Sequence, residues 1–231
     1  MIKDIQYLKH GALSIGVILS EEELVRFSEF FDMVTECNKA FNLTAITEEK
    51  DFIDKHIIDS LSGTNEIPLN SSLCDIGAGA GFPSVPIAIT RPDLHVTALD
   101  STAKKMGFVQ NCAKTLSLHN VQTIVGRAEE QTKLFETFDI VTARAVSALP
   151  ILLELSIPLL RVGGKFIAYK TDETELASAA NALKTLHAVH LSTKLLTLPN
   201  GDKRAILVFE KLASTPKQYP RQYGAIKKKP L

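Results

Sequence analysis

The chain has 231 residues, enough for one large α/β domain with an accessory segment or for two small domains, at roughly 100 to 200 residues per domain. Hydrophobic residues make up 45% and charged residues 23%, which argues against disordered, collagen-like and coiled-coil classes. The formal net charge of +0 conceals an asymmetry. Residues 21–66 carry twelve acids and four Lys or Arg, whereas residues 211–231 carry six bases and no acid. The basic end could bind phosphates; the alternative is a solvated tail that only keeps the protein soluble.

The three cysteines, Cys37, Cys74 and Cys112, form no close pair, so the sequence indicates neither a disulfide framework nor a metal site. The apolar run at residues 11–19 is followed by three glutamates without a small-residue cleavage site, which argues against an export signal. No run approaches the ~18 apolar residues that a membrane-spanning helix needs. We therefore expect a cytoplasmic protein with no membrane partner.

The first sixty-odd residues are predicted to form a helical cap. Ser20 and Glu23 make a capping box, which starts a helix that runs to about Ala40. A second helix is predicted from about Glu48. The apolar faces of the two helices recur at three- or four-residue steps: Leu24, Phe27, Phe31 and Val34 in the first, and Phe52, His56, Ile57 and Leu61 in the second. The polar stretch 65–72, which contains Pro68, marks the boundary of the cap.

After this boundary, short apolar runs alternate with helix-length segments, a pattern typical of βαβ units and a parallel sheet. The turn at residues 199–202 predicts a hairpin that closes the sheet. We expect a cap at residues 1–65, an α/β core at residues 66–212 and a basic tail at residues 213–231. The seven predicted strands are Ser72–Ile76, His95–Leu99, Val121–Val125, Asp139–Thr142, Lys165–Tyr169, Leu191–Leu198 and Ala205–Phe209.

A glycine-rich loop follows the first predicted strand. Residues 75–83 read Asp-Ile-Gly-Ala-Gly-Ala-Gly-Phe-Pro and place Gly77, Gly79 and Gly81 within five residues. Glycine lacks a Cβ and tolerates positive φ, so this backbone can turn sharply and approach a ligand closely. Pro83 suits the first turn of a following helix. The loop is predicted to bind a cofactor, and a strand-to-helix turn without a ligand is the alternative.

Asp100 ends the second strand, 23 residues after Gly77, where doubly wound folds place an acid that binds ribose hydroxyls. This position fits either NAD or S-adenosylmethionine (SAM). The GxGxG spacing leaves less provision for a pyrophosphate than GxGxxG, and Asp75 lies two residues before the first glycine. Together with the terminal hairpin, these features favour SAM.

Two more loops lie at the expected carboxyl edge of the sheet. Ala128 and Glu129 follow the third strand, where the Ala128 amide and the acidic side chain could bind an adenine; a surface loop is the alternative. Arg144 follows the fourth strand. A buried arginine needs a partner, so it could pair with a core carboxylate or hold the SAM carboxylate or the substrate.

The sequence resembles the GidB (RsmG) family of bacterial 16S ribosomal RNA guanine-N7 methyltransferases. The matching motifs span most of the chain. They are Phe41-Asn42-Leu43-Thr44-Ala45-Ile46, residues 56–61, the glycine loop at residues 75–83, Ala143-Arg144-Ala145, residues 209–211 and Tyr219-Pro220-Arg221. The sequence departs from the family pattern at Ser84 and Thr171, where the family usually has glycine.

The resemblance implies a SAM-dependent methyltransferase (Rossmann-like) fold with a seven-stranded, mostly parallel sheet and an N-terminal helical extension. It implies SAM as the cofactor, and 16S rRNA or the 30S particle as the partner. It assigns cofactor contacts to Gly77, Phe82, Ala128, Glu129 and Arg144. Our own placement of the glycine loop and of the ribose adds Gly79, Gly81 and Asp100.

The implied reaction transfers a methyl group to N7 of a guanine in the 530 loop of 16S rRNA. N7 carries no proton, so the reaction needs no general base, and we assign no catalytic residue. N7 faces the deep major groove of A-form RNA, so the target must be unpaired. Tyr219 and Tyr223 could stack on bases. The expected substrate-binding residues are Asn42, Thr44, Arg144, Arg221, Lys227, Lys228 and Lys229.

Two alternatives remain at this stage: a methyltransferase that acts on a small molecule or protein, and a nucleotide-binding regulatory protein without turnover. An RNA affinity that falls steeply with salt concentration would favour an RNA methyltransferase over an enzyme that acts on a small molecule or protein. The sequence does not distinguish naked rRNA, the 30S subunit or an assembly intermediate as the substrate. It carries no signal of oligomeric state, and a monomer is the simplest expectation.

Overall fold

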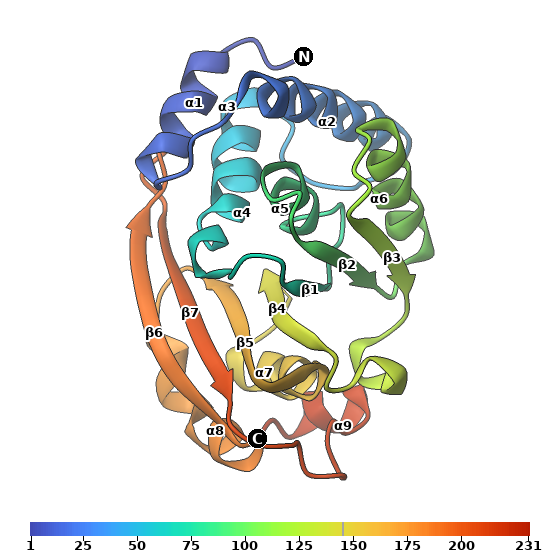
Figure 1. Cartoon of the computed structure of the whole chain (residues 1–231), viewed down its shortest axis with the longest axis vertical. Helices are drawn as coiled ribbons and strands as arrows, with labels where there is room; N and C mark the ends of the chain where they lie inside the picture. The colour runs from blue at the N-terminus through green and yellow to red at the C-terminus, as the bar shows by residue number, and fades with distance from the viewer. Residues whose placement is uncertain (145) are drawn as a thin grey trace.

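The computed structural model describes residues 1–144 and 146–231. Its seven strands form one sheet in the order β3-β2-β1-β4-β5-β7-β6 (Figure 1). All seven predicted strands are confirmed, and several are longer than predicted. They are β1 (Ser72–Ile76), β2 (His95–Asp100), β3 (Val121–Val125), β4 (Phe138–Arg144), β5 (Leu160–Lys170), β6 (Ala188–Thr197) and β7 (Lys203–Lys211).

Strands β1 to β5 pair in parallel, whereas β7 pairs antiparallel with both β5 and β6. The strand order reverses at β1, which lies between β2 and β4. In open α/β sheets, ligands bind outside the carboxyl ends of the strands at such a switch point. The topology therefore places the functional site beside the loops that follow β1, β2 and β4.

The N-terminal cap consists of α1 (Ile5–Ser14), α2 (Glu21–Ala40) and one further helical segment. The capping box of α2 is confirmed, since the Ser20 amide donates to Glu23 Oε2 at 2.7 Å and the Glu23 amide donates to Ser20 Oγ at 3.3 Å. The second predicted helix is present as α3 (Glu49–Phe52), the π-helical η1 (Ile53–Ile58) and α4 (Asp59–Leu61).

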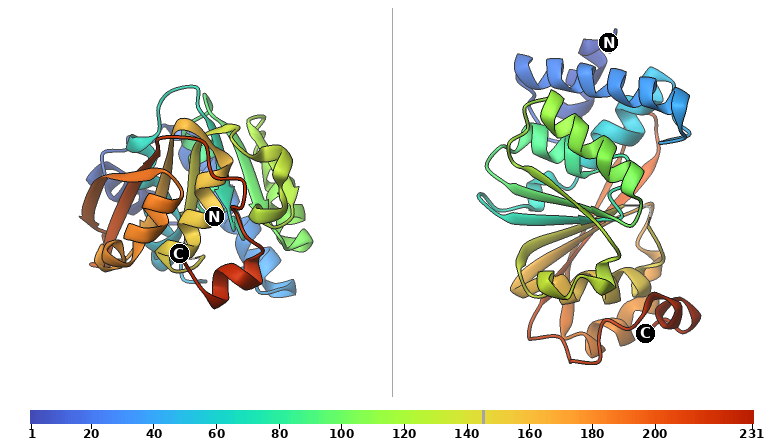
Figure 2. Two further views of the ribbon diagram at one scale, coloured as in Figure 1. Left: turned by 90° about the horizontal axis from the view of Figure 1, so that it is seen from below. Right: turned by 90° about the vertical axis from the view of Figure 1, so that its right-hand side faces the viewer.

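Helices cover both faces of the sheet (Figures 1 and 2). On one face, α5 (Ser84–Thr90) and α6 (Ala103–Thr115) share a hydrophobic core with the cap. On the other face, α7 (Leu149–Ser156), α8 (Ala180–Thr185) and α9 (Tyr223–Lys228) form a second core. The short helices are η2 (Thr64–Glu66), η3 (Ala128–Glu130), η4 (Thr132–Leu134), η5 (Ile157–Leu159) and η6 (Thr174–Ala179).

The basic end of the chain packs against the second core. Ile226 of α9 is fully buried there. Arg221 binds Glu154, a fully buried carboxylate on α7, through a bidentate contact in which Nε and Nη2 donate at 2.8 and 2.6 Å. Arg221 is also one of the predicted RNA-binding residues; its guanidinium binds Glu154 in the structure, and its contact with RNA stays a prediction. The division at residues 65 and 212 stays a prediction, although both end segments pack onto the sheet.

Two further properties concern the described residues alone. None of their helices combines the length and apolar character needed to cross a bilayer. No three of their His, Cys, Asp or Glu side chains gather into a group able to hold a metal ion.

Candidate functional site

The glycine-rich loop between β1 and α5 has the backbone conformation that the sequence predicts. Gly77, Gly79 and Gly81 have φ values of 67°, 58° and 91°. A Cβ on Gly77 would lie 2.7 Å from Val146 Cγ2, and one on Gly81 would lie 2.6 Å from Val85 Cγ2. All three glycines adopt the positive φ that the turn requires. Gly77 and Gly81 also leave room for the neighbouring valine side chains, whereas Gly79 has no such close neighbour.

Asp100 joins this loop to the end of β2. Its carboxylate accepts hydrogen bonds from the backbone amides of Gly79 at 3.0 Å and Thr102 at 2.8 Å. Each carboxylate oxygen can accept more than one hydrogen bond, so capacity for a ribose hydroxyl remains. The acid and the glycine loop, predicted separately from the sequence, are parts of one site.

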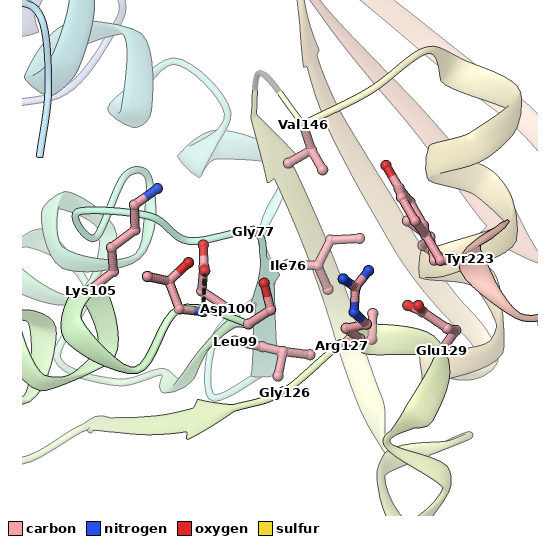
Figure 3. Close-up of a pocket in the computed structure, with 14 residues that line it drawn as sticks. Ile76, Gly77, Leu99, Asp100, Lys105, Gly126, Arg127, Glu129, Val146 and Tyr223 are labelled. Atoms are coloured by element: carbon pink, nitrogen blue, oxygen red, sulfur yellow. Dashed lines mark hydrogen bonds between the residues drawn. The ribbon is translucent and has the colours of Figure 1, made fainter. Parts of the chain in front are cut away.

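A cavity of about 360 Å³ opens beside these residues at the carboxyl edge of the sheet (Figure 3). Asp100 and Lys105 lie toward one end, and Glu129 and Tyr223 lie toward the other. We call it the cofactor cavity. Its lining consists of Ile76, Gly77, Leu99, Asp100, Ser101, Thr102, Lys105, Gly126, Arg127, Ala128, Glu129, Val146, Leu155 and Tyr223.

The end of the cofactor cavity near η3 fits an adenine. Glu129 is only 7% exposed, and its Oε1 has no hydrogen-bond partner among the described residues. A buried acceptor without a partner is costly, and an adenine amino group is a donor that would satisfy it. The residues present therefore fit SAM, and the contacts of Asp100 with the ribose and of Glu129 with the base stay predictions.

Asp75 supports the site from within the core. It is fully buried, and it accepts hydrogen bonds from the Ser84 amide at 3.1 Å and from Thr142 Oγ1 at 3.1 Å. Burial raises the pKa of Asp75 to about 7, against the opposing effects of these hydrogen bonds and of Arg144. Asp75 thereby ties the end of β1 to the start of α5 and to β4.

A second cavity, of about 430 Å³, lies next to the same edge of the sheet. We call it the acceptor cavity. Its lining consists of Ile46, Lys55, His56, Asp59, Arg144, Tyr169, Lys170, Thr171, Glu175 and Arg204. Arg144, the last residue of β4, lines the acceptor cavity, and Val146 lines the cofactor cavity, so both cavities border the carboxyl end of β4.

Charged groups in the acceptor cavity are held in pairs. Asp59 accepts from Arg144 Nη1 at 3.0 Å and from Arg204 Nε at 3.0 Å. Lys170 Nζ donates to Glu175 Oε1 at 2.8 Å. Asp59 and its two arginines are at most 15% exposed and are shielded from solvent, whereas Glu175 of the other pair is 37% exposed. These pairs fix the shape of the cavity.

His56 connects the cap to both the glycine loop and Arg144. Its ring stacks on Phe82 with centroids 4.1 Å apart and planes at 11°. Nδ1 lies 3.2 Å from Arg144 Nη2, a group that can only donate, so Nδ1 accepts and Nε2–H donates to Thr44 Oγ1 at 2.8 Å. Burial, with a further effect from Arg144, lowers the pKa of His56 to about 3. The imidazole is therefore neutral at physiological pH.

The structure divides the predicted cofactor residues into two groups. Gly77, Asp100, Ala128 and Glu129 line the cofactor cavity. The other four lie outside this lining: Gly79 donates to Asp100, Gly81 packs on Val85, Phe82 is buried against His56, and Arg144 lines the acceptor cavity. Their contacts with SAM stay predictions.

The predicted substrate residues are also dispersed. Asn42 is exposed, while Thr44 is held against His56. Lys227, Lys228 and Lys229 are exposed on and after α9. Of the two departures from the family pattern, Thr171 lines the acceptor cavity, and Ser84 is buried and lines neither cavity.

The sequence analysis missed several lining residues. Arg127 and Tyr223 of the cofactor cavity, and Lys55, Asp59 and Arg204 of the acceptor cavity, are brought together by tertiary contacts. Asp59 gave a signal, since it lies within the family-like motif at residues 56–61, and Tyr223 was considered, but only for stacking on RNA bases.

Solved structures share this fold at low sequence identity. Precorrin-6y C5,15-methyltransferase from Geobacter metallireducens matches with a TM-score of 0.53 and 15% identity, covering 72% of this chain and 90% of that chain. M. jannaschii TYW2, solved in complex with AdoMet, matches with a TM-score of 0.54 and 15% identity, covering 67% and 77%. The [4+2]-cyclase SpnF reaches 0.60 at 12% identity, covering 84% and 98%, so the fold alone does not fix a reaction.

The seven-stranded fold, the glycine loop and the cavity that fits an adenosine agree with one class, the SAM-dependent methyltransferases, and the sequence relatives establish that class. The family is equally clear from sequence comparison. The family model GidB, rRNA small subunit methyltransferase G, matches residues 23–206. Ribosomal RNA small subunit methyltransferase G from Leuconostoc citreum is 42% identical over 225 residues, and the same enzyme from Streptococcus pyogenes is 44% identical over 224 residues, each alignment covering 94% of both chains. The chain belongs to the GidB family.

Proposed function

We propose that this protein transfers a methyl group from SAM to N7 of a guanine in the 530 loop of 16S rRNA, and that the acceptor cavity receives the guanine. The family supplies the small-subunit rRNA as the partner. The observation that carries the choice of N7 is the chemistry of the acceptor cavity, because none of the described residues that line it is a free general base.

Each proton acceptor of that lining is engaged or deactivated among the described residues. Asp59 binds two arginines, and Glu175 binds Lys170 and the Leu149 amide. The His56 pKa of about 3 makes its imidazole a poor base. An exocyclic amine or a hydroxyl would need a base during methylation, whereas a ring nitrogen with a lone pair and no proton would not. Guanine N7 meets this requirement.

When bound, SAM supplies an activated methyl group, and the transfer is an in-line displacement that depends on alignment. The protein's part is to hold the base so that N7 faces the methyl group of SAM in the cofactor cavity. Methylation places positive charge on the ring. The carboxylates of the acceptor cavity, Asp59 and Glu175, are already paired with cations, so these pairs would have to rearrange for either carboxylate to offset this charge.

The test is methylation of 16S rRNA fragments that contain the 530 loop, with radiolabelled SAM as the donor. A matched fragment carries 7-deazaguanine in place of guanine, so that a C–H group replaces N7 and Watson–Crick pairing is kept. We expect transfer to the first fragment and none to the second. Methylation of the 7-deaza fragment at an equal rate would assign the reaction to another atom.

We also propose that the exposed Lys227, Lys228 and Lys229 contact RNA phosphates. Replacing all three by Ser should weaken RNA binding and flatten its log-log salt slope by about two units, at about 0.7 to 0.9 per phosphate contact. Fluorescence titration at several salt concentrations measures both. An unchanged slope would show that these lysines only keep the segment solvated and that the folded domain alone binds RNA.

A further inference from the structure

We propose that the C-terminal segment, residues 213–231, forms one wall of the cofactor site, and that Tyr223 contacts the adenosine part of SAM there together with Arg127. This inference concerns the binding of SAM, whereas the proposed function concerns the RNA acceptor. The sequence analysis treats Tyr223 as a candidate for stacking on RNA bases. In the structure its side chain lines the cofactor cavity instead (Figure 3).

Tyr223 and Arg127 lie together at the end of the cofactor cavity near η3. The Arg127 guanidinium lies over the Tyr223 ring, with Cζ 5.5 Å from the ring centroid, within the range of a cation–π contact. Arg127 directly precedes Ala128 and Glu129 in η3, the residues placed for the adenine. A ring at this position can pack against a purine nucleoside, because aromatic side chains and nucleobases stack favourably.

The segment is fixed to the rest of the protein by Arg221 and by Ile226. Arg221 neutralises the buried Glu154, and its Nη2 also donates to the Lys229 carbonyl at 3.0 Å. Ile226 is fully buried one helical turn after Tyr223. Leu155, the neighbour of Glu154 on α7, itself lines the cofactor cavity. The anchor on α7 is therefore one residue away from the cavity wall.

The wall formed by Tyr223 and Arg127 also affects the charge of Glu129 and its access to solvent. The cofactor cavity contains the unpartnered Glu129 Oε1 at the same end as Tyr223. A wall that covers this end reduces the access of water, and excluding water strengthens a hydrogen bond between the carboxylate and an amino group. Tyr223 and Arg127 would thus favour an adenine base at this position both by contact and by shielding.

The experiment measures the affinity for SAM by calorimetry, with S-adenosylhomocysteine and adenosine as further probes. Tyr223→Ala should weaken SAM binding about tenfold or more, since removing one aromatic stack on a base costs about 1 to 3 kcal/mol and 1.4 kcal/mol is tenfold. Tyr223→Phe should bind within about twofold of the wild type. Because the contact is with adenosine, Tyr223→Ala should weaken all three ligands by similar factors.

Tyr219→Ala is the matched control, because Tyr219 belongs to the same segment and also lies beside an arginine, with Arg221 Cζ 5.8 Å from its ring, but does not line the cavity. It should leave SAM affinity unchanged. Arg127→Ala, made on a different element, should also weaken SAM binding. If Tyr223→Ala proves unstable by urea denaturation, Tyr223→Leu and Arg127→Ala decide the question.

Wild-type SAM affinity in folded Tyr223→Ala and Arg127→Ala would overturn the inference. So would an equal loss in Tyr219→Ala, because that result would indicate general loosening of the segment. These measurements contain no RNA, so their outcome is separate from that of the N7 test.

Discussion

Removing Arg221 should destabilise the protein, although the residue lies in a basic segment near the chain's end. Glu154 accepts hydrogen bonds from the Arg221 amide at 3.0 Å, from Nε at 2.8 Å and from Nη2 at 2.6 Å, and its side chain is 0% exposed. Arg221→Ala would leave this carboxylate buried without its counter-ion. Breaking a buried ion pair on one side costs about 3 to 5 kcal/mol, so we expect a loss of that order in the free energy of unfolding.

Urea denaturation gives this quantity directly, and the chain offers a matched control. Arg26 has the same side-chain exposure as Arg221, 26%, but its partner Glu22 is 75% exposed. Arg26→Ala should cost no more than about 0.5 kcal/mol, because exposed helix pairs contribute little. In a Glu154→Gln background, the cost of Arg221→Ala should also fall, since no buried charge would then remain.

The reasoning would be refuted if Arg221→Ala cost less than about 1 kcal/mol, or no more than Arg26→Ala. That result, combined with weaker RNA binding, would return Arg221 to the role of a phosphate ligand. Loss of stability would instead establish Arg221 as the residue that fastens the C-terminal segment to α7.

Three further predictions concern the glycine loop and its supports. The raised pKa of about 7 for Asp75 means that the free energy of unfolding of the wild type falls as pH rises from about 4 through 7. Asp75→Asn removes this loss, so its effect on the free energy of unfolding should be more favourable at pH 8 than at pH 4 by up to about 4 kcal/mol; parallel pH profiles in urea would contradict this. His56→Gln should reduce by about 2 kcal/mol the stability lost between pH 7 and pH 5, because the lowered pKa of about 3 makes acid unfavourable to the native state; an unchanged loss on acidification would contradict it. Gly81→Ala should cost about 1 to 3 kcal/mol more than Gly79→Ala in urea, since both have positive φ but only Gly81 would place a Cβ 2.6 Å from buried Val85; equal costs would argue against this packing.

The sheet and the long cap helix could be predicted from the sequence because local signals specify them. The apolar periodicity and the capping box define α2, and apolar runs bounded by turns define the strands. Helix α1 was not predicted, because the apolar run at residues 11–19 was considered only as an export signal, which was rejected. In the structure Asp4 caps this helix by accepting from the Tyr7 amide at 3.0 Å.

The site could be predicted only where one segment carries its own signal. Gly77 directly follows β1 and Asp100 ends β2, and because these strands are parallel neighbours, both residues lie at the carboxyl edge of the sheet. The pairing of Arg221 with Glu154 joins residues 67 positions apart, and no local pattern reveals that a glutamate on α7 is fully buried. The same limit applies to Tyr223, since its place in the cavity depends on how α9 docks.

Helix α9 has only six residues, yet it presents two different surfaces. Tyr223 and Ile226 face the protein, while Lys227 and Lys228 are exposed to solvent. If nucleoside and RNA both bind this helix, their affinities are thermodynamically linked, and each ligand changes the other's binding constant by the same factor. The demethylated product retains the adenosine, so this linkage is the same before and after turnover. Under the same condition, any change in RNA affinity that accompanies methyl transfer would arise at the sulfonium end of the cofactor rather than at α9.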